Sequence, residues 1–239
     1  TGADLFPAGS LVGSPDPARE AAILATWSSG VAGSVIEFPS EAVATELIGP
    51  LAATDDSVRL RALICVVDAS HVLEDLFSDE YQPVRDQESG VKSPLVARAE
   101  LAMRQIEYAS VVVLVNWEPL KTSSLATFMA LISNLTPRAR LHLAGARPLS
   151  LGEMNVYGVD QDRAGWTCVL NGEHRPHMTD RRVTTLHYEE PRPLHPERLM
   201  MLLDRIEAGE FGRVVRSAGF CRLATRSTTI AHWEHVGCV

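Results

Sequence analysis

Lysine and cysteine are scarce in this chain of 239 residues. Lys92 and Lys121 are the only lysines among 22 basic residues, so a mechanism that needs a positioned lysine has two candidates. The four cysteines contain no C-x-x-C pair and lie far apart, which excludes a disulfide-stapled scaffold and predicts free thiols in a reducing, cytoplasmic compartment. They are Cys65, Cys168, Cys221 and Cys238.

Long apolar runs are also absent. The longest stretches, such as residues 110–115, have the length of a strand, whereas a membrane helix needs about 20 apolar residues. The sequence therefore predicts no membrane span. It also lacks a basic-then-apolar signal peptide, and it begins at Thr1 within a stretch rich in Gly, Pro and Ser that ends at Pro17, so we expect a processed or partial chain.

What is present is enough apolar material for a full core. The apolar fraction of 46% and the charged fraction of 22% exclude a disordered or fibrous chain and favour one large or two small domains. The net charge is −8, with acidic residues in excess in the first half and basic residues slightly in excess in the second. Bulk charge therefore does not favour binding to DNA.

The pattern of residues 34–145 indicates alternating strands and helices, after a connector and remnant at 1–33. Residues 35–38 form a short apolar run, and Ser40 can cap a helix that Gly49-Pro50 ends. Residues 61–68 are almost continuously apolar, as in a parallel strand buried on both faces.

The same alternation continues after a polar loop at 77–92. Ser93-Pro94 is expected to open a helix to about Ser110, residues 111–115 form a second buried strand, and residues 124–135 form an amphipathic helix. This order predicts an α/β fold with a partial doubly wound parallel sheet.

A second, smaller α+β domain is predicted at 181–239, after a linker at 146–180 that is rich in Pro, Gly and Asp. Residues 183–188 read as a strand, and His195-Pro196 opens a helix that Gly209 ends, with His195 as its cap. Two more strands are expected at 211–224, with a turn at Ala218-Gly219, and at 228–236.

A long ordered string of motifs in the second half gives a more specific signal. It consists of Gly165-Trp166, Leu170-Asn171-Gly172-Glu173-His174, Pro191-Arg192-Pro193-Leu194-His195-Pro196-Glu197-Arg198-Leu199 and Val215-Arg216-Ser217-Ala218-Gly219-Phe220. In these residues the chain resembles the CobW-type GTPases, relatives of the UreG and HypB metallocentre assembly proteins, over roughly residues 34–239. The resemblance implies a P-loop GTPase-like domain at 34–145 followed by a CobW C-terminal-like domain at 181–239.

Several features that the family uses for chemistry are missing from the sequence. No G-x-x-x-x-G-K-[ST] phosphate loop is present, and neither lysine has that context. The family's zinc motif of closely spaced cysteines is absent as well. The switch segment, usually Glu-x-x-Gly, reads Glu37-Phe38-Pro39-Ser40, so the glycine that would approach the γ-phosphate is replaced. We therefore expect no GTP hydrolysis by this chain alone.

The resemblance nevertheless implies GTP and Mg²⁺ in the parent protein, and four residues are candidates for the nucleotide site. The guanine-specificity motif falls at Asn116-Trp117-Glu118-Pro119, where Asn116 is retained and Glu118 can replace the usual aspartate. Alternatively, Trp117 packs into the domain and Pro119 ends the strand. Asp68 lies at the carboxyl end of a buried strand, where α/β folds bind ligands, or it forms part of a turn. Glu37 is the fourth residue.

The C-terminal residues offer two further candidate sites. His232-x-x-His235-x-x-Cys238 contains ligand types that zinc accepts, although residues three apart on an extended strand point to opposite faces and would need a bend. Alternatively, these histidines are solvated. Four arginines predict a local positive face that is either solvated or contacts an acidic partner or RNA. They are Arg213, Arg216, Arg222 and Arg226.

Two functions follow from the resemblance. The first is a CobW-like GTP-binding protein of metal homeostasis, with zinc as the metal, that delivers metal to client metalloproteins. The alternative is an interaction factor linked to zinc limitation, which recruits a ribosome hibernation factor and has degenerate GTPase motifs.

Overall fold

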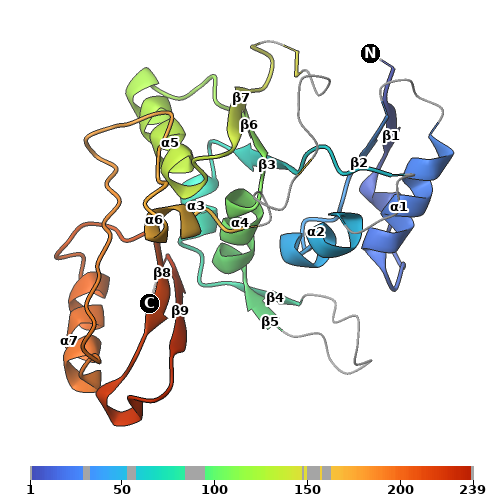
Figure 1. Ribbon diagram of the computed structural model, residues 1–239. Coiled ribbons are helices and arrows are strands. Elements are labelled where there is room, and N and C mark those ends of the chain that lie inside the picture. Colours follow the sequence, from blue (N-terminus) through green and yellow to red (C-terminus); the bar gives the residue numbers. More distant parts are fainter. Residues whose placement is uncertain are drawn as a thin grey trace.

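A three-stranded parallel sheet lies at the centre of the molecule (Figure 1). The computed structural model describes residues 2–28, 33–52, 58–83, 95–146, 148–149, 157 and 163–237. The sheet consists of β3 (Ile64–Asp68), β6 (Val111–Val115) and β7 (Arg140–Leu143), in the order β3-β6-β7. Strands β3 and β6 confirm the two strands that were predicted from apolar runs in the sequence. Strand β7 was not predicted.

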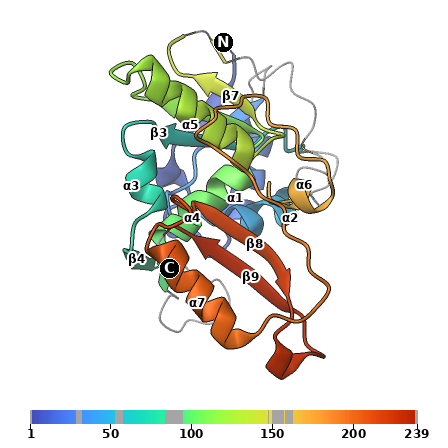
Figure 2. The same cartoon turned by 90° about the vertical axis from the view of Figure 1, so that its left-hand side faces the viewer.

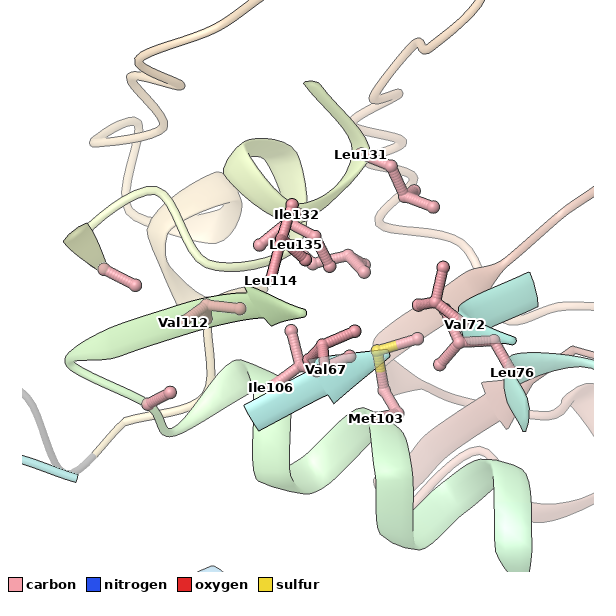
Figure 3. Close-up of a cluster of buried hydrophobic side chains, with 12 residues drawn as sticks. Val67, Val72, Leu76, Met103, Ile106, Val112, Leu114, Leu131, Ile132 and Leu135 are labelled. Atoms are coloured by element: carbon pink, nitrogen blue, oxygen red, sulfur yellow. The ribbon is translucent and has the colours of Figure 1, made fainter. Parts of the chain in front are cut away.

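The main hydrophobic core joins this sheet to three helices, α3 (Val72–Leu76), α4 (Arg98–Glu107) and α5 (Thr122–Leu135). Figure 3 shows the side chains of α5 on one side of β6 and those of α4 near β3. Alternate residues of each strand point to one face of a sheet, and on the inward face Val67, Val112 and Leu114 are buried. The core comprises Val67, Val72, Leu76, Met103, Ile106, Ala109, Val112, Leu114, Leu131, Ile132, Leu135 and Ala139.

The opposite face of the sheet is much less covered. Val66 is 64% exposed, which contradicts the prediction that its strand is buried on both faces. The strand order explains the difference, because two successive right-handed crossovers in the same direction place α4 and α5 on the same face. The described part of the sheet is therefore an α/β layer with its core on one side.

The N-terminal region contains regular structure that the sequence analysis missed. The connector predicted at 1–33 holds β1 (Asp4–Phe6), a short 3-10 helix (Ala8–Ser10) and α1 (Pro17–Trp27). Asp16 caps α1 by accepting a hydrogen bond of 2.9 Å from the Arg19 N–H. Strand β1 pairs in parallel with β2 (Ser34–Ile36), and these two form a sheet of their own.

Helix α2 (Ala44–Ala52) begins and ends later than predicted. It continues through Gly49 and includes Pro50, which the sequence analysis took as its end. Leu47 and Leu51 are buried against α1, so burial of this face outweighs the hydrogen bond that the proline removes.

A small antiparallel pair replaces part of the predicted loop and helix. It consists of β4 (Tyr81–Pro83) and β5 (Leu95–Ala97), so α4 begins at Arg98 rather than at Ser93-Pro94, which lie outside the described residues. The Arg98 guanidinium contacts Asp75 at 2.8 Å and Glu80 at 3.0 Å, and these ion pairs hold the start of α4 to α3 and to the residue before β4.

The predicted linker includes one short helix, α6 (Thr167–Leu170). Gly165 precedes it and packs so closely on α5 that a Cβ at this position would lie 1.7 Å from the Leu135 carbonyl oxygen. The glycine of the Gly165-Trp166 motif is therefore required by a close approach of two backbones.

The C-terminal unit, which we define as residues 181–237, contains α7 (Pro196–Glu207), β8 (Arg216–Cys221), a 3-10 helix (Ala224–Arg226) and β9 (Ala231–Val236) (Figure 2). Helix α7 confirms the prediction, although His195 makes no side-chain capping hydrogen bond. Residues 183–188 belong to no strand, contrary to prediction. Gly219 lies within β8, and the turn comes later, around the 3-10 helix. None of the described helices is long and apolar enough to cross a membrane.

Candidate functional site

Asp68 and Asn116 meet at the carboxyl edge of the central sheet. Because β3 and β6 are parallel, with Asp68 opposite Val115, the end of one strand lies beside the end of the other. The Asn116 Nδ2 group donates a hydrogen bond of 2.7 Å to the Asp68 Oδ2 atom. Asn116 adopts a left-handed backbone conformation with φ of 52°, which asparagine tolerates better than most residues, and this turns the chain at the edge.

The second carboxylate oxygen of Asp68 is held by Ser70. It accepts hydrogen bonds from the Ser70 hydroxyl at 2.5 Å and from the Ser70 N–H at 2.8 Å. Hydrogen bonds from Ser70 and Asn116 stabilise the charged form and lower the pKa of Asp68. Asp68 therefore has the turn role considered above and is a fixed anion, suited to an N–H group or a cation rather than to a phosphate.

Trp117 and Glu118 do not extend this pair into a base pocket. The Trp117 Nε1–H donates a hydrogen bond of 2.9 Å to the Ala144 carbonyl, which ties Trp117 to the turn after β7. This is the alternative in which Trp117 packs into the domain. Glu118 is exposed, and no hydrogen bond joins it to Asn116 or Asp68 in the described part of the chain.

Glu37 lies in the other parallel sheet. Its backbone N–H donates to the Phe6 carbonyl at 2.9 Å, and its carboxylate accepts a hydrogen bond of 3.3 Å from the Ala8 N–H. The structure thus joins Asp68 to Asn116 directly and places Glu37 with the N-terminal strands.

The candidate metal ligands are placed apart. His232 faces outward on β9, opposite Phe220, where it contacts the Trp166 and Phe220 rings at centroid distances of 5.8 and 5.6 Å. His235 is half-buried and lies three residues along the same strand, on its other face. Cys238 lies outside the described residues. Among the residues that are described, no group of three His, Cys, Asp or Glu side chains is placed to hold a metal ion.

A buried ion pair connects the C-terminal unit to α4, and the sequence analysis missed it. The Arg216 Nε and Nη2 groups donate hydrogen bonds of 3.0 and 3.2 Å to the two Glu107 carboxylate oxygens. The side chains of Glu107 and Arg216 are only 1% and 6% exposed. Arg216 also contacts Glu234 at 2.8 Å, and Glu234 contacts Arg104 of α4 at 3.3 Å. The available signal was Glu107 itself, four residues after Met103 on the apolar stripe of α4.

This network also changes the interpretation of the four C-terminal arginines, because it removes Arg216 from the predicted positive face. Arg216 is neutralised in the interior, and Arg213 stacks on the Phe77 ring at 4.0 Å from its centroid. Arg222 donates to the Pro191 carbonyl at 2.6 Å. Three of the four arginines therefore make contacts within the molecule.

The chain is similar to several known proteins. Residues 183–239 match the family described as the cobalamin synthesis protein cobW C-terminal domain. The chain is 26% identical over 203 residues to zinc-regulated GTPase metalloprotein activator 1 of Dictyostelium discoideum, and the match covers 83% of this chain and 42% of that protein. The chain thus spans less than half the length of this curated relative.

Two solved structures of the YjiA GTPase of E. coli are also similar. They are the Zn(II)-bound protein, with a TM-score of 0.37, and a Zn(II)-bound triple mutant, with a TM-score of 0.36. Each is 11% identical to this chain, and each match covers 85% of this chain and 61% of the YjiA chain. The domain match and the curated relative together make this chain similar to the CobW-type GTPases, most directly in residues 183–239.

Proposed function

We propose that this chain is part of a cytoplasmic, CobW-like GTP-binding protein of zinc homeostasis that delivers metal to a client metalloprotein. The name of the Dictyostelium discoideum relative, zinc-regulated GTPase metalloprotein activator 1, supports this proposal. The observation that carries it is the buried Glu107–Arg216 pair, because it couples the CobW C-terminal region to the layer that contains Asp68 and Asn116. A nucleotide-dependent change at that layer would thereby reach a client-binding surface.

The proposed domain division follows the family pattern. Residues 1–33 form a connector and remnant, 34–145 a P-loop GTPase-like domain whose sheet becomes doubly wound in the complete protein, 146–180 a linker, and 181–239 the CobW C-terminal domain. In this proposal the C-terminal domain contacts the client.

This chain contains only some of the residues that a bound GTP molecule would need. The amide of Asn116 and the carboxylate of Glu118 can form hydrogen bonds with the edge of a guanine base. Asp68 and Glu37 are the two other acidic residues that we propose for the nucleotide site. The sequence contains no glycine-rich phosphate loop, and Asp68 as a fixed anion disfavours a phosphate beside it. GTP and Mg²⁺ would therefore need phosphate-binding groups from outside these residues, and we derive no hydrolytic step.

Zinc is matched even less well by the described residues, which contain no ligand cluster. His232, His235 and Cys238 remain the proposed ligands, and binding would require a bend in β9 that brings the two histidines to one side. In this proposal zinc is cargo for the client.

The function is tested by deleting the gene under zinc limitation and measuring the zinc content of fractionated metalloproteins. We expect at least one zinc protein to lose metal and to regain it when the wild-type gene is restored. The same client should be captured by the tagged protein from zinc-limited cells. Unchanged zinc occupancy throughout the fractions would contradict the proposal.

The alternative role, recruitment of a ribosome hibernation factor, is favoured by the degenerate base motif, in which Trp117 is bound to Ala144. It predicts that the tagged protein co-sediments with ribosomal particles during zinc limitation. A metal-delivery protein would stay at the top of the same sucrose gradient, so one experiment separates the two functions.

A further inference from the structure

A second candidate site lies away from the Asp68–Asn116 edge of the sheet. It is formed by α5, β7 and the segment that follows α6. We call residues 174–182 the strap. The strap runs along α5 (Figure 1) and is attached to it at three points. The His174 Nε2 group contacts the Asn134 carbonyl at 3.1 Å, Met178 N–H donates to the Ser133 hydroxyl at 3.1 Å, and Arg182 donates to the Ser123 carbonyl at 2.8 Å.

The strap, α5 and β7 enclose a hollow of about 440 Å³. Small-molecule sites usually occupy about 300–1,000 Å³, so the size suits a small ligand. The lining is mostly apolar: Met129, Leu141 and Met178 are partly exposed, and Val112 and Ile132, labelled in Figure 3, are buried behind them. The apolar and hydroxyl lining residues are Val112, Met129, Ile132, Ser133, Thr136, Ala139, Leu141 and Met178.

The charged part of the lining is entirely basic. Arg138, Arg140 and His177 line the hollow, and no aspartate or glutamate does. Arg138 is held by Glu173 at 2.9 Å, outside the lining. Arg140 is exposed, and none of the described carboxylates forms an ion pair with it. The chain as a whole carries a net charge of −8, so this local excess of positive charge is not a property of the whole surface.

We propose that this hollow binds a small amphipathic anion, a straight-chain carboxylate whose apolar body lies between α5 and β7 and whose carboxylate faces Arg140. The apolar lining favours the chain, and the cationic rim selects the charge at its end. Met129 and Met178 have flexible, polarisable side chains that can adapt to such a chain. Val112 and Leu141 lie towards the amino ends of their strands, so this site is separate from the Asp68–Asn116 edge and does not depend on the proposed function.

The test uses octanoate and methyl-labelled methionine in the 239-residue chain. The NMR methyl signals of Met129 and Met178 should shift saturably, with a dissociation constant at or below about 1 mM. Met200 and Met201 are exposed on α7 and serve as internal controls that should not move. Each methylene removed, from octanoate to hexanoate to butanoate, should weaken binding roughly fourfold per carbon.

The charge requirement is tested with octan-1-ol and with two matched variants. Arg140→Gln should weaken octanoate binding about tenfold and leave octan-1-ol binding unchanged, because it removes one charge-assisted contact. Arg226→Gln, which removes an exposed arginine of the C-terminal unit, should have no effect. Met178→Trp should fill the hollow and abolish the shift at Met129, with circular dichroism confirming the fold.

Three outcomes would overturn the site. No saturable shift at Met129 and Met178 in the folded protein would exclude it. Equal shifts at Met200 and Met201 would show non-specific association with exposed apolar side chains. Octan-1-ol binding as tightly as octanoate would exclude an anion-selective site. The chain-length series and the alcohol need no variant, so they test the proposal even if a substitution unfolds the protein.

Discussion

The α/β layer and the C-terminal unit are stabilised in different ways. In the layer, Met103, Val112 and Leu114 have no exposed surface, and both strands and helices contribute to one core. In the C-terminal unit, none of the described apolar side chains is buried, and α7 contains no buried residue. A unit without a core of its own must obtain its stability from the surface on which it docks.

Several contacts make up this docking surface. Val215 and Val236 pack against the main core, and the buried Arg216 is paired with Glu107. Gly237 lies so close to α3 that a Cβ would be 2.2 Å from the Leu76 carbonyl oxygen. The docked end of the β8–β9 hairpin is therefore fixed, whereas its far end and α7 are exposed.

The largest effect is expected from breaking the buried ion pair. Arg216→Leu leaves the Glu107 carboxylate buried without its partner, which typically costs about 3–5 kcal/mol. Urea denaturation monitored by circular dichroism should show this loss of stability. Arg192→Ala, which breaks an exposed ion pair with Glu190, should cost less than about 1 kcal/mol and is the matched control.

A double variant tests the cause. Glu107→Leu combined with Arg216→Leu removes both charges, so much of the lost stability should return. A double variant as unstable as Arg216→Leu alone would show that packing of the arginine stem, and not an unpaired charge, accounts for the effect.

The next largest difference is expected when an apolar side chain is shortened to alanine in each of the two regions. Met103→Ala creates a cavity in the main core and should lower the free energy of unfolding by about 2–5 kcal/mol. Leu202→Ala on α7 should change it by about 0.5 kcal/mol or less, because that side chain is 42% exposed. Equal losses in thermal or urea unfolding would mean that α7 is buried in solution, against a partner copy or another part of the protein.

The sequence could predict elements whose stability is local. The pattern of α7 and the apolar run of β6 were enough for their positions. By contrast, β1 depends on pairing with Ser34–Ile36 and β4 on pairing with Leu95–Ala97, and three-residue strands carry no periodicity of their own. Pro50 was interpreted from its intrinsic preference, but burial of the surrounding helix decided the outcome.

The candidate site was predictable to a similar extent. Asp68 and Asn116 follow two parallel strands, and the ends of such strands meet at one edge, so their contact could be anticipated. The direction of the Trp117 side chain could not be anticipated. It depends on a hydrogen bond to the Ala144 carbonyl, in the turn after β7, a strand that the sequence analysis missed. The Glu107–Arg216 pair joins residues 109 positions apart, which no local pattern connects.

Gly237→Ala should have a smaller and more local effect than the core variants. The glycine has φ of 68° and contacts the α3 backbone, so alanine adds strain and moves the hairpin away from Leu76. We expect a loss of about 1–3 kcal/mol, with faster hydrogen exchange in β8 and β9 and little change in β6. Gly172→Ala, which has a similar φ and open space around it, controls for the backbone strain alone. Uniformly faster exchange would mean that hairpin and layer unfold together, which would break the distinction between the two regions.

The smallest effect concerns the edge of the layer itself. Asp68 has a lowered pKa because Ser70 and then Asn116 donate hydrogen bonds to its charged form. A depressed folded-state pKa contributes stability above the unfolded-state value, and that contribution is lost as the pH falls through the folded-state value. Ser70→Ala should therefore raise the pKa of Asp68 towards its ordinary value, and Asn116→Ala should raise it by a smaller amount. The carboxyl carbon shift of Asp68 followed by NMR between pH 2 and 6 measures both changes. If Asn116→Ala left the titration unaltered, the amide would not be bound to Asp68 in solution and would remain available to a ligand, whereas the expected rise would show that this edge is organised before any nucleotide arrives.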